Sequence, residues 1–85
     1  MNSTLVNPSI HDYYELPSQR EIEVLQLIAF EYTSKEIADR LYISRETVNT
    51  HRKNLMFKLR VKNVAGLIRK AFETRLLSLN VSSVA

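Results

Sequence analysis

Two capping boxes determine where helices begin in this chain. A capping box places a glutamate three residues after a serine or threonine, and each side chain accepts a hydrogen bond from the other residue's backbone N–H. Ser18 with Glu21 and Thr33 with Glu36 have this spacing, and Ser44 can cap a further helix. Because these starts are close together in the sequence, they predict short helices joined by tight turns. We therefore expect an all-α fold.

Four helices are expected from the caps and from the spacing of apolar residues. Asn63 can cap the last helix, and 85 residues are enough for one core of this kind. These elements should make residues 17–77 a single four-helix domain. The expected helices are residues 19–30, 34–41, 44–60 and 64–77. The residues predicted to form the core are Ile22, Val24, Leu25, Leu27, Ile28, Ala29, Ile37, Ala38, Leu41, Val48, Leu55, Leu59, Val64, Leu67, Ile68 and Ala71.

The two ends of the chain lack a periodic pattern. Residues 1–16 contain Asn7-Pro8 and several polar side chains, so we expect a flexible arm, and residues 78–85 should fray. The N-terminus lacks the basic start and apolar stretch of a signal peptide, and no apolar run is long enough to cross a membrane. We expect a cytoplasmic protein that does not enter a membrane.

The second and third helices are expected to form a helix-turn-helix. Only a few residues separate Leu41 from Arg45, so the connection between the two helices must be tight. On a helical wheel of about 100° per residue, Val48, Leu55 and Leu59 fall together as the buried side of the third helix. The opposite face is polar and cationic, as expected of a helix that lies in a DNA groove. Its residues are Glu46, Asn49, Thr50 and Lys53.

Positive charge is concentrated on the third helix and the residues that follow it. The formal net charge is only +3, but Glu46 is the lone acid in this segment, whereas the first half of the chain is acidic. Asparagine and threonine are poor helix formers, and a role in base contact would explain Asn49 and Thr50 in mid-helix. Clustered cations favour a polyanion such as double-stranded DNA, and a charged face that only keeps the protein soluble is the alternative. The cations are Arg45, Arg52, Lys53, Lys58, Arg60 and Lys62.

Other function classes lack the residues that they need. The chain has no cysteine, and His11 and His51 alone cannot form a zinc site. Gly66 is its only glycine, which excludes a glycine-rich phosphate loop, and no catalytic constellation can be placed in one pocket. We therefore expect no enzymatic activity, no metal, no cofactor and no small-molecule ligand.

Several blocks of sequence together resemble a known family. They are Arg20-Glu21-Ile22-Glu23-Val24-Leu25, Ser34-Lys35-Glu36-Ile37-Ala38-Asp39-Arg40-Leu41, Ile43-Ser44, Thr47-Val48-Asn49-Thr50-His51 and Lys58-Leu59. With these blocks the chain closely resembles the LuxR/FixJ/GerE helix-turn-helix family, from about Pro17 to Leu77 and without insertion. The resemblance implies a four-helix domain of a bacterial transcription regulator, in which the second and third helices bind DNA and the fourth makes dimer contacts. A sigma-factor region with a similar helix pair is a rival that fits the blocks less well.

The same resemblance implies roles for individual residues on helix 44–60, which would enter the major groove. The family's base-reading positions fall on Asn49, Thr50 and Lys53, which the helical wheel also turns outward. Asn49 could pair with an adenine edge, Lys53 with guanine acceptors, and the Thr50 methyl group with a thymine methyl. The positions that fit phosphate contacts are Lys35, Ser44, Arg45, Thr47, Arg52 and Lys58.

The fourth helix has a second apolar edge beside the one that faces the core. Ala65, Phe72 and Leu76, with Arg69 between them, line this edge. This edge could be buried by the partner subunit of a homodimer or by the N-terminal arm of the same chain, and both alternatives remain open. The alternative function is a protein-interaction module that docks a regulator or an RNA polymerase subunit through this helix and Phe57.

Some residues depart from the family pattern or from the helical wheel. Glu31, Arg60 and Arg75 stand where family members often have glycine, so either they adopt a positive φ at a cost of the order of 1 kcal/mol each or the turns differ. Phe57 lies on the DNA side of the wheel, where it could extend beyond the groove, pack under a loop or touch a partner. His51, at the edge of the core, is expected to be packed and hydrogen-bonded rather than to contact phosphate.

Overall fold

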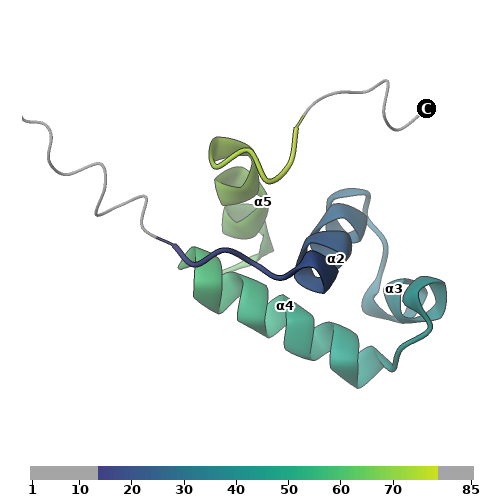
Figure 1. The fold of residues 1–85 in the computed structure, drawn as a ribbon. Coiled ribbons are helices and arrows are strands. Elements are labelled where there is room, and N and C mark those ends of the chain that lie inside the picture. The colour runs from purple at the N-terminus through teal and green to yellow at the C-terminus, as the bar shows by residue number, and fades with distance from the viewer. Residues whose placement is uncertain (1–13, 79–85) are drawn as a thin grey trace, which may run out of the picture.

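The computed structural model describes residues 14–78. These residues form four helices and no strand, labelled α2 to α5 in Figure 1. Their bounds are α2 Gln19–Ala29, α3 Ser34–Leu41, α4 Arg45–Leu59 and α5 Val64–Glu73. The predicted all-α fold is confirmed, while most of the expected arm and tail lies outside the described residues.

Each helix begins at the cap that the sequence predicted. Ser18 N donates to Glu21 Oε1 over 2.8 Å, and Glu21 N donates to Ser18 Oγ over 3.1 Å. The second capping box has the same reciprocal bonds, at 2.8 and 3.2 Å. These contacts satisfy N–H groups that the first turn of a helix leaves without a partner, so the local sequence fixes the helix starts. The four N-caps are Ser18, Thr33, Ser44 and Asn63.

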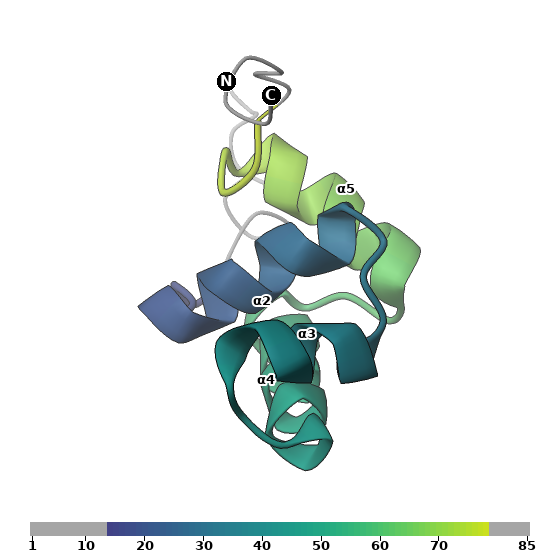
Figure 2. The same ribbon diagram turned by 90° about the vertical axis from the view of Figure 1, so that its right-hand side faces the viewer.

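Helix α4 packs against each of the other three helices. Figure 1 shows it along one edge of the molecule with α2 and α5 on the same side of it, and Figure 2 shows α3 crossing near its N-terminal end. The core therefore forms on one face of α4, and the opposite face is exposed. The buried core residues are Val24, Leu25, Ile28, Ile37, Ala38, Val48, Leu55, Leu59, Leu67 and Ala71.

The predicted core differs from the observed one only at its margins. Every buried core residue was predicted, but Val64 was wrong, because this first residue of α5 is 37% exposed. A helical wheel gives the direction of a side chain and not how far the neighbouring helix reaches. The predicted core residues that are only partly buried are Ile22, Leu27, Ala29, Leu41 and Ile68.

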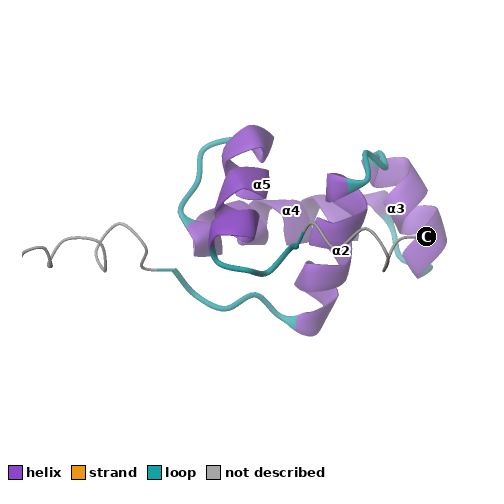
Figure 3. Cartoon of the chain, turned by 90° about the horizontal axis from the view of Figure 1, so that it is seen from above, coloured by secondary structure: helices purple, strands orange, loops and turns teal. Residues whose placement is uncertain are grey.

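The predicted end of the last helix was wrong. Helix α5 ends at Glu73 instead of Leu77, and Figure 3 shows the chain leaving it as a loop. Arg75 turns the chain with a φ of 65°, and Leu76 and Leu77 then pack against the core. The prediction failed because the spacing of Leu76 and Leu77 is compatible with one more helical turn and also with a chain that folds back over the core.

Within residues 14–78, four residues other than glycine have a positive φ, one after each helix. Glu31, Arg60 and Arg75 have φ angles of 70°, 58° and 65°, so the turns keep the backbone that glycine favours. Tyr42, which the sequence did not single out, has a φ of 58°. A residue in this conformation lets the following N–H groups bond back to the last helical turn. Each position costs of the order of 1 kcal/mol relative to glycine.

The segment before α2 is attached to α4 and α5. Glu15 N donates to Lys58 O over 3.0 Å, and Tyr14 packs against the core with its ring centroid 5.9 Å from Lys70 Nζ. Tyr14 and the backbone of Glu15 are therefore attached to the domain ahead of Pro17, whereas Leu16 is 75% exposed.

Candidate nucleic-acid interface

The outward face of α4 carries the predicted base-reading residues. Asn49, Thr50 and Lys53 are all exposed, on the side of the helix away from the core. Thr50 Oγ1 donates to the backbone oxygen of Glu46 over 3.1 Å. This bond commits the hydroxyl proton to the helix and leaves the methyl group for an apolar contact. The face therefore offers amide and ammonium donors together with a methyl group.

Asn49 has a partner on the neighbouring helix. Ser34 Oγ donates to Asn49 Oδ1 over 2.9 Å. Because Ser34 is the first residue of α3, the bond joins the two helices of the helix-turn-helix on their exposed side. Sequence reasoning missed Ser34, since the contact depends on how two helices pack and leaves no local signal.

The start of α4 combines hydroxyl and amide groups. Ser44 Oγ accepts from Thr47 N and donates to Thr47 Oγ1, both over 2.9 Å. The Thr47 hydroxyl proton is thus left for another acceptor, and Arg45 is exposed beside it. The first N–H groups of a helix attract anions, so this arrangement suits a phosphate oxygen.

The predicted phosphate-contacting and base-reading cations differ in whether they form ion pairs within the domain. Within residues 14–78, no ion pair joins Arg45, Arg52 or Lys53 to an acid. Lys35 Nζ lies 3.5 Å from Asp39 Oδ2 in a highly exposed pair, a kind that contributes little to stability. All four cations therefore keep their charge for a polyanion.

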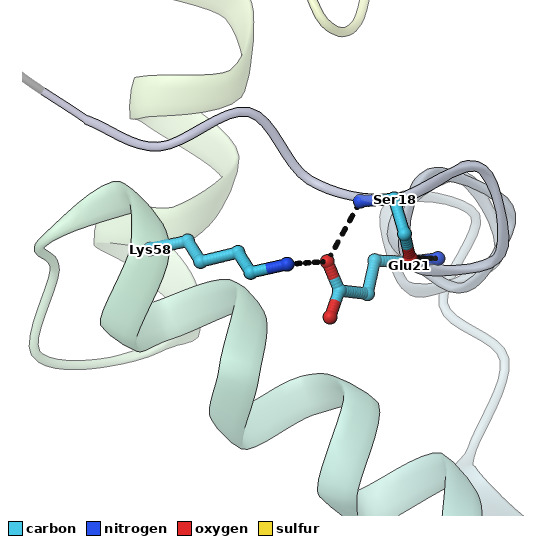
Figure 4. Close-up of polar contacts among 3 residues, drawn as sticks. All are labelled: Ser18, Glu21 and Lys58. Atoms are coloured by element: carbon cyan, nitrogen blue, oxygen red, sulfur yellow. Dashed lines mark hydrogen bonds and ion pairs between the residues drawn. The ribbon is translucent and has the colours of Figure 1, made fainter.

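Lys58 differs from these four cations. Its Nζ donates to Glu21 Oε1 over 2.8 Å, and the same oxygen accepts from Ser18 N (Figure 4). The Glu21 side chain is 5% exposed and that of Lys58 is 25% exposed. The ion pair joins the start of α2 to the end of α4, so we assign Lys58 a structural role in place of the predicted phosphate contact.

The same pair determines how Glu21 titrates. Burial raises the pKa of this carboxyl group, but the hydrogen bonds from Lys58 and Ser18 and the charge of the ammonium outweigh burial. The pKa of Glu21 therefore lies below its ordinary value, and the group is ionised in the folded protein at neutral pH. The sequence marked Glu21 only as part of a helix cap.

His51 matches its prediction only in part. Its side chain is partly buried, as expected at the edge of the core. Its Nδ1 is buried and has no hydrogen-bond partner among the described residues, so the predicted hydrogen bond was wrong for this nitrogen. The helical wheel gave the direction of the ring but not which polar atoms surround it.

Phe57 lies at the C-terminal end of α4. Its side chain is 76% exposed, which excludes the alternative that it packs under a neighbouring loop. A shallow cavity of about 320 Å³ lies beside it. The cavity is lined by Glu15, Met56, Phe57, Lys58, Arg60 and Val61.

The second edge of α5 is shorter than predicted. Ala65 and Arg69 are exposed and Phe72 is partly exposed, with Arg69 Nη1 3.3 Å from Glu73 Oε2. Leu76 was wrong as a member of this edge, because it follows the end of α5 and packs against the core. A second molecule would therefore meet an edge formed by Ala65, Arg69 and Phe72.

Two kinds of feature are absent from the described part of the chain. No helix in residues 14–78 combines the length and the apolar character needed to cross a membrane. No three histidine, cysteine, aspartate or glutamate side chains in this range are grouped so that they could hold a metal ion.

Known proteins match both the sequence and the fold. A family model for bacterial regulatory proteins of the luxR family, GerE, matches residues 17–71. Oxygen regulatory protein NreC of Staphylococcus carnosus (strain TM300) is 41% identical over 69 residues, which are 81% of this chain and 32% of NreC. NreC of Staphylococcus aureus (strain MRSA252) is 38% identical over 76 residues, which are 89% of this chain and 35% of NreC. The chain thus spans about a third of the length of these curated relatives.

Two solved structures resemble the arrangement of helices. Response regulator ChrA of a heme-sensing two-component system has a TM-score of 0.70 and 36% identity, over 74% of this chain and 31% of the ChrA chain. Transcription factor GerE also has a TM-score of 0.70, with 35% identity over 74% of this chain and 94% of the GerE chain. The fold described here therefore corresponds to nearly all of the GerE chain.

Proposed function

Because this chain belongs to the LuxR family of bacterial regulatory proteins, we propose that it binds double-stranded DNA sequence-specifically and thereby regulates transcription. Membership of this family makes it a regulatory domain and not an enzyme. We propose that α4 lies in the major groove, where Asn49, Thr50 and Lys53 contact base edges. The proposal rests on the exposed face of α4, which combines donors, a methyl group and cations opposite a fully packed core. With DNA as its partner, the domain works in the cytoplasm.

Phosphate contacts come from both helices of the helix-turn-helix in this proposal. Lys35 provides one from α3, and Arg45 and Arg52 provide others from α4. The Ser44 and Thr47 pair at the start of α4 adds hydroxyl and amide donors. Contacts of this kind position the protein on the duplex but carry no sequence information.

DNA binding should weaken steeply as the salt concentration rises. The measurement is fluorescence anisotropy of a labelled random-sequence duplex titrated with the full chain at several salt concentrations, which needs no known operator. Each neutralised phosphate gives log K a slope of about −0.9 against log salt, so a fourfold rise in salt should lower affinity about 3-fold per phosphate contact.

Matched variants test whether the salt dependence of DNA binding arises from the cations of α4. An Arg52→Ala, Lys53→Ala double variant should bind more weakly and show a salt slope smaller in magnitude by about 1 or more. A Lys62→Ala variant, which removes an exposed cation outside α4, should change binding less. If the folded wild type does not bind DNA at low salt, the proposal fails and docking of a protein through α5 becomes the better one.

We also infer that two copies bind together through α5. The edge formed by Ala65, Arg69 and Phe72 is exposed or partly exposed in the described structure, and helix-turn-helix dimers bind paired half-sites. Sedimentation of the protein at high concentration with duplex DNA should therefore give two subunits per complex. A Phe72→Glu variant should give one, because a charge on this edge disfavours its burial. One subunit per complex for the wild type would contradict the dimer.

A further inference from the structure

Glu46 is the only acidic residue of α4, and it lies on the face that would read DNA. It is exposed, whereas Val48 on the opposite side of the helix is fully buried. Lys53 follows Glu46 after seven residues, almost two helical turns, so the two side chains lie about 20° apart around the helix axis. Asn49 and Thr50 lie one turn further along, on either side of this line. The carboxylate therefore belongs to the centre of the proposed base-reading face.

No cation of the domain offsets the charge of this carboxylate. Three other surface acids each pair with a cation three or four residues away, over 3.0 to 3.5 Å. The residues three and four positions after Glu46 are the neutral Asn49 and Thr50. Within residues 14–78, the Glu46 carboxylate has no ion pair and no hydrogen bond. Its negative charge is thus left for whatever meets the outward face of α4.

A free carboxylate is costly beside DNA unless a base supplies a donor. The phosphates that line the groove repel it. In the major groove, guanine presents two acceptors, thymine presents an acceptor, and adenine presents an amino group beside the acceptor N7. Cytosine presents only the donor of its N4 amino group. Because the N-terminal residues of a recognition helix contact base edges, a carboxylate in the first turn of α4 is matched to cytosine.

We propose that Glu46 is a specificity-determining residue whose carboxylate accepts a hydrogen bond from the N4 amino group of a cytosine. The inference rests on the proposed function, because it requires α4 to lie in the major groove. Glu46 acts in the opposite direction to the cations of this face. It lowers the affinity for DNA in general and recovers that loss only where cytosine satisfies it, so it contributes mainly by rejecting the other bases.

An acid in the first turn of a helix also interacts favourably with the helix dipole. If this were the whole role of Glu46, its removal would destabilise the start of α4 and weaken binding to every duplex alike. Base reading predicts changes of opposite sign on two duplexes. The duplex selected by the wild type should be bound more weakly, and a random one more tightly.

The test combines selection from a random pool of duplexes with anisotropy titrations, for the full chain and its variants. In the selection, Glu46→Ala should flatten the preference at one base position, where the wild type should prefer cytosine about 10-fold, as expected for one hydrogen bond to a charged group. In the titrations, Glu46→Ala should bind the wild type's selected duplex about 5-fold more weakly. It should bind a random duplex about 2-fold more tightly, because the repulsion from phosphates is gone.

Glu31→Gln is the matched control, because it removes an exposed acid outside α4. It should leave the base preference and the ratio of the two affinities unchanged. Circular dichroism of each variant confirms that it is folded.

Several results would overturn the inference while DNA binding itself remained intact. One is a wild-type preference for a base other than cytosine at the position that Glu46→Ala flattens, and another is that this variant flattens no position. An equal change of affinity for both duplexes, in either direction, would likewise leave Glu46 without a base-reading role. Loss of wild-type binding to every duplex would instead contradict the DNA-binding function.

Discussion

Replacing Lys58 by methionine should lower the free energy of unfolding by about 2 to 3 kcal/mol at neutral pH. The variant removes the ammonium group beside Glu21, whose side chain is only 5% exposed, and leaves a buried carboxylate without its ion-pair partner. Methionine keeps most of the aliphatic stem, so the loss reflects the charge rather than packing. The cost is lower than for a fully buried pair, because 25% of the Lys58 side chain is exposed.

The difference in the free energy of unfolding between the wild type and Lys58→Met should become smaller at acid pH. In the wild type the pKa of Glu21 is lower in the folded than in the unfolded protein, so the pair's contribution is fully present above the unfolded pKa. That contribution disappears as the pH falls through the folded pKa, because Glu21 is then protonated and no longer attracts the ammonium group. Urea unfolding followed by circular dichroism across a pH series measures both effects.

The control for this experiment is Lys62→Met, which removes an exposed cation and should change stability little. A double variant, Glu21→Gln with Lys58→Met, should lose less than the sum of the two single changes, because neither charge is left behind. An equal loss in Lys62→Met, or a loss in Lys58→Met that does not vary with pH, would contradict the structural role assigned to the pair.

Lys53→Ala should weaken binding to the selected duplex by about 1 to 3 kcal/mol and relax base preference. Lys53 is exposed on α4 and is not paired with an acid within residues 14–78, so its ammonium group can donate to guanine acceptors. Because only the correct base satisfies that donor, the loss should be larger on the selected duplex than on a random one. Anisotropy titrations of both duplexes at one salt concentration measure the difference.

Two other lysines provide the comparison for Lys53. Lys35→Ala removes a proposed phosphate contact and should weaken all sequences alike, while Lys62→Ala should change little. If Lys53→Ala also weakens every sequence equally, Lys53 is a phosphate contact, and the base-reading role falls to Asn49 and Thr50.

The parts of the fold that depend on local sequence could be predicted. The partners in a capping box lie three residues apart, so Ser18 and Thr33 identified helix starts without knowledge of the tertiary structure. Helical periodicity likewise gave the buried side of α4, with Val48, Leu55 and Leu59 all fully buried. The exposure of Asn49, Thr50 and Lys53 follows from the same pattern.

The contacts that could not be predicted join elements far apart in the sequence. Lys58 looked like one more surface cation, because its partner Glu21 is brought to it only when α2 packs on α4. The bond between Ser34 and Asn49 likewise depends on how α3 crosses α4. In both cases the sequence identified the chemical group correctly but not the group that it meets.

The attachment of the segment before α2 also determines how the domain bears mechanical load. Glu15 N bonds to Lys58 O, and Ser18 N and Lys58 Nζ share one oxygen of Glu21. A force applied at Tyr14 would therefore load the last turn of α4 through Lys58 as well as the start of α2. Lys58 lies in the same helix as Asn49 and Lys53, so such a force would reach the helix that carries the proposed DNA-reading face.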